Sequence, residues 1–195
     1  MKFLGADVTL MGKIGDDEFG KILLDIMRRH GLEGGMIIDP ESTSSYTAVI
    51  AVPGIDRIFL HHSGANDTFC ADDIDYDACA GATLFHMGYP PIMAKMYEND
   101  GEQLVTVYKR IRELGCLTSL DMCAVDPNSP AGLANWKSIV IKTLPYVDFF
   151  LPSIEEILFM LDRDHYDELQ ERANGQDVTL VLDLEKDVAP MADRL

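Results

Sequence analysis

The sequence is poor in basic residues and in cysteine, and it contains no long hydrophobic run. Its 16 Lys and Arg stand against 33 Asp and Glu, which gives a formal net charge of -17 at pH 7. Nucleic acid is therefore not an expected partner, because phosphate binding relies on clustered Lys and Arg. No apolar run approaches the roughly 18 residues of a membrane span, and the charge of Asp7 comes too early for a secretory signal peptide. We expect a cytoplasmic protein without a membrane partner.

Cysteine is scarce and irregularly spaced. The four cysteines show neither metal-ligand nor redox spacing, and they are too few for the disulfide framework of a small secreted protein. We expect free thiols, mostly buried. They are Cys70, Cys79, Cys116 and Cys123.

The remaining composition is that of a folded globular protein. Apolar residues make up 47% of the chain and charged residues 25%, which excludes a disordered acidic segment. A chain of 195 residues is long enough to bury roughly 70% of its unfolded surface in one domain. We find no repeat and no interdomain linker, and we expect a single domain over residues 1–195.

Short β-rich runs alternate with longer amphipathic patterns. Residues 18–30 place apolar side chains on one helical face, and Gly31 follows as a stop signal. Further helices are expected at 102–114, from about 130 with Leu133 and Trp136 on one buried side, and from 154. Strands are expected at 8–12, 82–87, 117–121, 147–151 and 178–182. This alternation predicts an α/β fold with right-handed crossovers and a three-layer, mostly parallel sheet.

Residues 36–63 interrupt this alternation. Two β-rich segments flank the turn residues Pro53 and Gly54, with no helical pattern between them. We expect an antiparallel β flap inserted into the parallel sheet, acting as a lid or as a dimerisation element. His61 and His62 are adjacent on its second strand, so they should face opposite sides and not chelate one metal ion.

Ligands of open α/β sheets bind outside the carboxyl ends of the strands. This rule selects the loops that begin at Gly12, Gly88, Asp121 and Pro152. Asp16 and Asp17, which precede the first helix, have two interpretations: caps of the helix amino terminus, which we favour, or ligands of a metal or substrate.

Several motifs, in their order along the chain, resemble the ribokinase-like (PfkB) carbohydrate kinase family. The first is MGKIGDDEFG at residues 11–20, followed by an amphipathic helix and a Thr-containing β flap. SGAN at 63–66, HMG at 86–88, the strand ending at Asp121 and LPSIEE at 151–156 follow in the family's order. The resemblance covers nearly the whole chain and implies a ribokinase-like fold with a β-flap lid.

The resemblance implies ATP-dependent transfer of the γ-phosphate to a sugar hydroxyl, with ATP and Mg²⁺ as cofactors and the flap closing over the sugar. Gly88 stands where some members of the family carry a sugar-binding Glu. Asp121 resembles a polar strand-end residue near the sugar and phosphates, and its alternative role is to cap a loop. Tyr46, Thr47 and Arg57 on the flap either contact the substrate or pack in a flap-to-flap homodimer.

Ser153 and Glu156 form the most informative candidate pair. In the family this segment usually reads Asn-x-x-Glu, with the Asn near the nucleotide and the Glu acting on Mg²⁺ and phosphate. Ser153 replaces the Asn here. Ser-x-x-Glu is also a capping box, in which both side chains bind backbone groups of their own helix. The two roles compete for the carboxylate of Glu156, and both remain open.

Two signatures of the family are missing from the sequence. The glycine pair with its sugar-binding Asn would precede residue 1, and the Gly-Ala-Gly-Asp motif that supplies the anion hole and the catalytic base would follow residue 195. SGAND at 63–67 mimics the second signature, but acidic residues follow it, so we interpret it as a turn that leaves the flap and do not assign Asp67 as the base.

The missing signatures predict an incomplete kinase that is inactive alone, and we assign no catalytic residue within it. The alternatives are a non-catalytic sugar-binding or regulatory module on the same scaffold, and a structural interaction domain.

Overall fold

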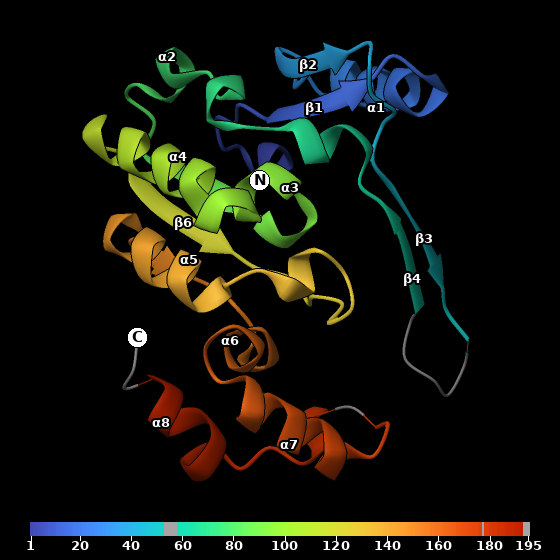
Figure 1. Ribbon diagram of the computed structural model, residues 1–195. Helices are drawn as coiled ribbons and strands as arrows, with labels where there is room; N and C mark the ends of the chain where they lie inside the picture. Colours follow the sequence, from blue (N-terminus) through green and yellow to red (C-terminus); the bar gives the residue numbers. More distant parts are fainter. Residues whose placement is uncertain (53–57, 177, 193–195) are drawn as a thin grey trace.

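The computed structural model describes residues 1–52, 58–176 and 178–192 (Figure 1). These residues form seven strands and eight α-helices, joined by loops and short 3-10 or π-helical turns. The strands are β1 (Met11–Gly15), β2 (Gly35–Asp39), β3 (Tyr46–Ile50), β4 (Ile58–His62), β5 (Leu84–Gly88), β6 (Leu117–Asp121) and β7 (Phe149–Phe150). The helices are α1 (Glu18–Arg29), α2 (Tyr76–Cys79), α3 (Ala94–Tyr97), α4 (Glu102–Glu113), α5 (Trp136–Thr143), α6 (Ile154–Leu161), α7 (Arg163–Ala173) and α8 (Ala189–Ala192).

The strand pairings confirm the predicted α/β class. β1 pairs with β2, and β5, β6 and β7 pair in that order, all of them in parallel. β3 and β4 form a separate antiparallel hairpin, as the sequence predicted. We use the name flap for this hairpin, residues 46–62. The predicted start of the flap at residue 36 is too early, because residues 35–39 belong to β2 and pair with β1.

The main core lies between the β5–β6–β7 sheet and the helices α3, α4 and α5. Leu104, Tyr108 and Ile111 of α4 are completely or almost completely buried there. The Tyr108 hydroxyl donates to the carbonyl of Ser119 on β6 at 2.8 Å. Burial of apolar side chains on one face of each helix supplies most of the free energy that holds these layers together.

The other face of the β5–β6–β7 sheet is largely exposed. Leu84, Leu117 and Phe149, one from each strand, all lie on this face with about half of their surface accessible to solvent. His86 also has an exposed ring, and its Nδ1 lies 2.6 Å from the hydroxyl of Ser119. A histidine within an apolar strand predicts a buried ring that is satisfied within the core, and this prediction is wrong because His86 lies on the exposed face.

A second, smaller core is formed by the carboxyl-terminal helices. Leu158 of α6, Leu169 and Ala173 of α7, Val178 and Met191 are buried together. The strand predicted at 178–182 is wrong: Val178–Leu180 forms a 3-10 turn, and Leu184–Val188 forms a π-helix before α8. Val178 is buried in this helical cluster, so its apolar side chain reflects a helical core and not a sheet.

Two other local predictions need correction. The strand expected at 8–12 lies three residues later, at Met11–Gly15. Leu133 is 82% exposed, whereas Trp136 is buried. The chain is extended at Ala134 between a 3-10 turn and α5, which breaks the helical periodicity that would have placed both side chains on one face.

Helix α1 is amphipathic, as predicted, but its apolar side is not buried. Phe19, Ile22 and Ile26 are 51%, 55% and 41% exposed. The helix ends as the sequence indicates, with His30 as the carboxyl cap and Gly31 at φ 62°. Within the described residues no helix is both long enough and apolar enough to cross a membrane.

Candidate functional site

The sequence selected Gly88 and Asp121 correctly as strand ends, but its selection of Gly12 is wrong, because β1 begins at Met11 and ends at Gly15. Gly15 is the register partner of Asp39 at the end of β1 and β2, and Gly88 is the partner of Asp121 at the end of β5 and β6. The arrows of β1 and β6 both point toward the side of the molecule where the flap lies (Figure 1). We use the name carboxyl edge for the ends of β5, β6 and β7 with the residues that follow them.

Gly88 and Asp121 are brought together at this edge, as predicted. The next residue, Tyr89, donates its backbone N–H to the carbonyl oxygen of Asp121 at 3.2 Å. One carboxylate oxygen of Asp121 accepts the N–H of Met122 at 2.9 Å. The Asp121 side chain therefore caps the start of its own loop and keeps its second oxygen available at the carboxyl edge.

Ser153 and Glu156 form the predicted capping box at the start of α6. The Ser153 hydroxyl accepts the N–H of Glu156 at 3.3 Å, and one carboxylate oxygen of Glu156 accepts the N–H of Ser153 at 2.8 Å. Burial raises the pKa of the Cys123 thiol to about 12, and the negative charges of Glu156 and Asp121 add to this increase. Because β7 pairs in parallel with β6 and α6 begins at Ile154, shortly after β7, the start of α6 follows the strand end next to that of β6.

A single carboxylate joins α1 to the start of the flap. The Asp17 side chain accepts the N–H of Gly20 at 2.8 Å, the N–H of Ser44 at 2.7 Å and the hydroxyl of Ser44 at 2.7 Å. The cap interpretation of Asp17 is confirmed, with the contact to Ser44 as an addition. These hydrogen bonds, that from the Ser44 N–H foremost, lower the pKa of Asp17.

Three glycines pack tightly around this carboxylate. A Cβ at Gly15 would lie 2.3 Å from the carbonyl oxygen of Ser42, and one at Gly20 would lie 2.1 Å from the carbonyl oxygen of Gly15. A Cβ at Gly64, where the chain leaves the flap, would lie 2.3 Å from the carbonyl oxygen of Thr43. We use the name flap base for Gly15, Asp17, Gly20, Ser44 and Gly64. No side chain fits at any of its three glycines.

The sequence gives little sign of Ser44 in this role. It lies in a run of Ser and Thr that reads as a polar loop, yet it is completely buried. Its hydroxyl also lies 3.0 Å from the N–H of Gly15. Because these contacts join residues 27 to 29 positions apart, no local pattern could have indicated them.

The two faces of the flap carry different side chains. Tyr46 is the register partner of His62, and Thr47 is the partner of His61, so the two adjacent histidines face opposite sides, as predicted. Tyr46 and Thr47 likewise face opposite sides, and only one of them can contact a ligand held against either face. Arg57, the third predicted flap contact, lies outside the described residues.

Tyr46 packs toward α1, whereas Thr47 is hydrogen-bonded on the other face. The rings of Tyr46 and Phe19 are stacked with centroids 5.1 Å apart. The hydroxyl of Thr47 lies 2.8 Å from Nδ1 of His61. Desolvation of the ring lowers the pKa of His61.

Asp67 occupies the turn that leaves the flap and has a structural role there. One of its carboxylate oxygens accepts the hydroxyl of Ser63, and the other accepts the N–H of Ala94 at the start of α3, at 3.2 Å. Both oxygens are engaged, which agrees with our decision not to assign Asp67 as a catalytic base.

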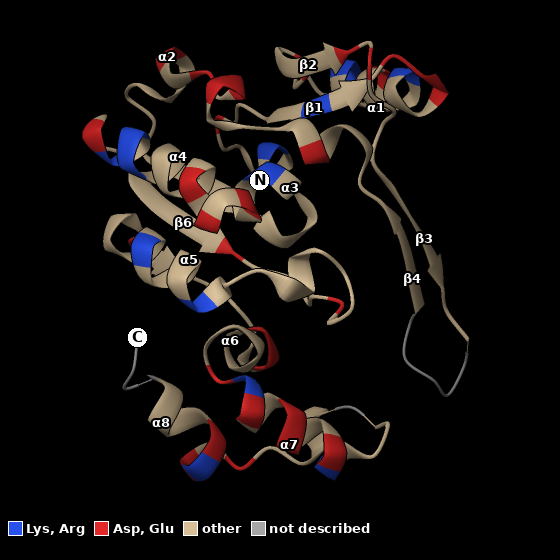
Figure 2. Ribbon diagram, viewed as in Figure 1, with Lys and Arg blue, Asp and Glu red and all other residues tan. Residues whose placement is uncertain are grey.

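Charge is unevenly distributed around these residues. Figure 2 shows acidic residues on most helices and none on the described strands of the flap. A cation near the flap base, Lys13 of β1, pairs with Asp73 at 2.8 Å and donates to the carbonyl of Thr68 at 3.2 Å. Within the described residues no three His, Cys, Asp or Glu side chains are placed to hold a metal ion together.

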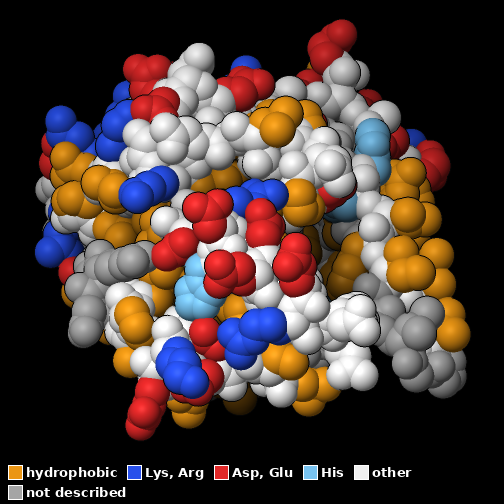
Figure 3. Space-filling model, turned by 60° about the horizontal axis from the view of Figure 1, so that its bottom comes forward, with side chains coloured by type: hydrophobic (Ala, Val, Ile, Leu, Met, Phe, Trp, Pro, Cys, Tyr) orange, Lys and Arg blue, Asp and Glu red, His pale blue; other side chains and the backbone are white. Residues whose placement is uncertain are grey.

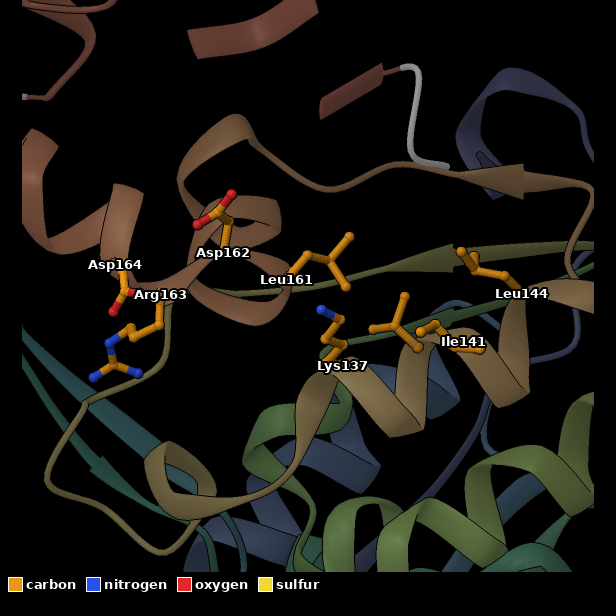
Figure 4. Close-up of a pocket in the computed structure, with 8 residues that line it drawn as sticks. Lys137, Ile141, Leu144, Leu161, Asp162, Arg163 and Asp164 are labelled. Atoms are coloured by element: carbon orange, nitrogen blue, oxygen red, sulfur yellow. The ribbon is translucent and has the colours of Figure 1, made fainter. Parts of the chain in front are cut away.

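A separate pocket of about 460 Å³ opens between α5 and the turn from α6 to α7 (Figure 4). Val140, Ile141, Leu144 and Leu161 contribute apolar surface to it, and four charged residues complete its lining. None of the predicted site residues lines this pocket. Two of its charged residues are basic, Lys137 and Arg163, and two are acidic, Asp162 and Asp164. This balance favours neither an anionic nor a cationic ligand.

Comparison with known proteins gives one family. The family model described as pfkB family carbohydrate kinase matches residues 1–183. An uncharacterized sugar kinase from Archaeoglobus fulgidus is 28% identical over 165 residues, which are 83% of this chain and 60% of the relative. Fructokinase-1 from Zea mays is 28% identical over 121 residues, 60% of this chain and 36% of that protein. The chain thus spans at most three fifths of the length of these curated relatives.

Solved structures share the fold. A fructokinase from Xylella fastidiosa with bound ATP superposes with a TM-score of 0.67 and 21% identity, covering 92% of this chain and 52% of that one. A ribokinase from Thermotoga maritima superposes with a TM-score of 0.60 and 16% identity, covering 98% of this chain and 52% of the other. These similarities confirm the predicted ribokinase-like fold.

Proposed function

The chain belongs to the pfkB family of carbohydrate kinases, and we propose that it serves in ATP-dependent phosphorylation of a sugar hydroxyl in the cytoplasm. The observation that carries the proposal is the family match over residues 1–183, and the positions of Gly88, Asp121 and Glu156 at or just after the ends of the neighbouring strands β5, β6 and β7 support it. Open α/β sheets bind their ligands at this edge.

In the proposed reaction an oxygen of the sugar attacks the γ-phosphorus of ATP. The new bond joins this oxygen to phosphorus, the bond to the β-phosphate oxygen of ADP breaks, and the hydroxyl proton passes to a base. We assign to the described residues the positioning of sugar and phosphates, and not the acceptance of this proton. Asp121 and the backbone at Gly88 bind sugar hydroxyls, and Thr47 or Tyr46 contacts the sugar when the flap closes and excludes water.

Ser153 and Glu156 are proposed to lie next to the nucleotide. Mg²⁺ bound to ATP needs only one or two protein carboxylates, because phosphates and water complete its coordination. Glu156 fits this role with its free carboxylate oxygen, since the capping box uses the other. The magnesium ion would neutralise phosphate charge during the transfer. The capping box then holds the carboxylate in place, so the two roles that compete in the sequence are compatible.

Fructose is the first substrate to test. Fructokinases from maize, rice, Arabidopsis and potato are among the curated relatives, with 24% to 28% identity to this chain. We extend to this chain the substrate, fructose, that the names of those proteins state. Ribose is the natural alternative, because a ribokinase shares the fold.

The flap is proposed to form a homodimer. All ten described residues of its strands are exposed, and Figure 3 shows hydrophobic side chains gathered along it, at the right of the view. An isolated two-stranded hairpin is at best marginally stable in water. The exposed side chain of Phe19 on α1, which stacks on Tyr46, extends the same apolar surface. A second copy of this surface would cover it.

The dimer is tested by sedimentation of Leu60→Asp against the control Leu133→Asp. Both leucines are exposed, at 58% and 82%, but only Leu60 lies on the flap. We expect Leu60→Asp to sediment as a monomer at concentrations where the wild type and Leu133→Asp are dimeric. A monomeric wild type would contradict the proposed dimer.

The sugar site is tested by isothermal titration calorimetry of the 195-residue chain with D-fructose, D-ribose and D-glucose. We expect saturable binding of at least one sugar, about tenfold weaker in Asp121→Asn, which loses a charged hydrogen bond. The control Asp77→Asn changes an exposed aspartate of α2 and should bind like the wild type. Equal affinities of all three proteins would remove Asp121 from the site.

A further inference from the structure

Tyr89 adopts a backbone conformation that bulky residues rarely take. Its φ and ψ are 67° and 51°, in the left-handed region. The other non-glycine residues with positive φ among those described are Asn99, Asp100 and Asn174. Asn and Asp enter this region readily, whereas a large side chain is strained there by contact between its Cβ and the backbone.

The neighbouring chain holds this conformation in place. The N–H of Tyr89 is bound to the carbonyl of Asp121, and its own carbonyl accepts the N–H of Ile92 at 3.1 Å. Pro90 and Pro91, which follow directly, are buried. The segment then reaches α3, whose first N–H is bound by Asp67 of the turn that leaves the flap. The segment from Tyr89 to Ala94 is thus bound to β6 at one end and to the turn that leaves the flap at the other.

The side chain of Tyr89 has no evident structural function. It is 47% exposed, and it forms no hydrogen bond or ring contact with any other described residue. Glycine would adopt the same backbone conformation without strain. Neither the turn nor the core therefore explains why a tyrosine stands at this position. Strained residues of this kind cluster at ligand-binding sites, where the surrounding structure enforces them.

We propose that Tyr89 contacts the sugar directly and is held in its strained conformation to present its ring at the carboxyl edge. Tyr89 follows Gly88 and is bonded to Asp121, the two residues to which the proposed function assigns sugar hydroxyls, and the inference rests on that function. An aromatic ring offers a flat apolar surface to the C–H groups of a sugar ring, and its hydroxyl remains free for a hydrogen bond. Tyr89 would thus select sugars with an apolar face and orient them for the flap to cover.

The test compares Tyr89→Gly and Tyr89→Leu with the wild type and with the control Asn174→Gly. Asn174 caps α7 with φ 49°, also in the left-handed region but in the carboxyl-terminal helices. Calorimetry with D-fructose, D-ribose and D-glucose gives the dissociation constant, and thermal unfolding gives the midpoint temperature. The Leu variant keeps an apolar side chain without the ring, so it reports on the aromatic contact even where Gly alters the turn.

We expect Tyr89→Gly and Tyr89→Leu to raise the dissociation constant of the bound sugar about tenfold. Tyr89→Gly should unfold within about 2 °C of the wild type, because relief of strain offsets the greater freedom of the unfolded chain. Asn174→Gly should match the wild type in both measurements. Unchanged sugar affinity in both Tyr89 variants would overturn the proposal and leave the sugar site intact. Absence of binding of all three sugars to the wild type would instead overturn the proposed function, and the role of Tyr89 with it.

Discussion

The flap base predicts that a substitution favourable to an isolated helix will destabilise this protein. Gly20 is the third residue of α1, a position where alanine in place of glycine normally stabilises a helix by about 1 kcal/mol. The added Cβ would lie 2.1 Å from the carbonyl oxygen of Gly15 and 2.8 Å from the hydroxyl of Ser44. Both distances are far below normal contact, and the oxygen of Gly15 belongs to rigid backbone.

The magnitude follows from these opposing terms. Relief of the clash requires the start of α1 to move away from the end of β1 by about 1 Å, and overpacking of this kind costs about 1–3 kcal/mol. The movement also lengthens hydrogen bonds of the completely buried Ser44. Subtraction of the gain in helix propensity leaves about 0–2 kcal/mol from overpacking alone. Because the weakened hydrogen bonds of Ser44 add to this cost, we expect Gly20→Ala to lower the free energy of unfolding by about 1–2 kcal/mol, the upper half of that range.

Urea denaturation followed by circular dichroism measures this change, with Gly34→Ala as the matched control. A Cβ at Gly34 would meet no heavy atom within 4 Å, so its unfolding free energy should stay within about 0.5 kcal/mol of the wild type. If Gly20→Ala proved as stable as the wild type or more stable, the close packing of the flap base would be refuted.

Three further predictions concern individual hydrogen bonds, one at the flap base, one in the main core and one at the start of α6. The pKa of Asp17 is lowered in the folded state, so the stability that this carboxylate contributes is present above its ordinary pKa of about 4 and is lost as the pH falls through its folded value. The difference in unfolding free energy between the wild type and Asp17→Asn, measured by urea denaturation, should therefore narrow from pH 5 to pH 2. A difference that stays constant over this range would contradict the hydrogen bonds to this carboxylate. Tyr108→Phe removes the buried hydrogen bond to the carbonyl of Ser119 and should cost about 1 kcal/mol in unfolding free energy, whereas an unchanged value would indicate that the bond is not formed. Ser153→Ala should lower the free energy of unfolding by about 1 kcal/mol because it removes the amino-terminal cap of α6. It should also weaken any Mg²⁺-dependent binding of ATP, because the Glu156 carboxylate loses its support. A variant as stable as the wild type would exclude the capping box.

The sequence is sufficient to predict elements whose stability is local. α4 and β6 were predicted within one residue, because a full apolar stripe, a glycine after the helix and a short β-rich run all agree. The capping box at Ser153 was predicted for the same reason, since its hydrogen bonds join residues three positions apart. The alternation of strands and helices was sufficient for the fold class.

Features set by distant residues could not be predicted in this way. The stripe of α1 predicts a buried face, but Phe19 packs on the flap, which leaves the helix half exposed. The residues next to Val178 in the sequence favour a β-strand, yet Val178 is buried in a helical cluster. The burial of Ser44 depends on Asp17 and Gly15, far away in sequence. The role of Tyr89 could not be predicted, because it depends on a positive backbone φ angle that the amino-acid sequence does not indicate at a tyrosine.

The most direct test of the account is to map sugar binding residue by residue. Backbone amide signals of the ¹⁵N-labelled chain would be followed by NMR during titration with D-fructose and, in parallel, with D-ribose. The account predicts saturable shifts concentrated at Gly88, Tyr89, Asp121 and the flap strands, with none at the pocket between α5 and α7. Shifts confined to that pocket, or no shifts with either sugar, would contradict the claim that the carboxyl edge and the flap form a sugar site.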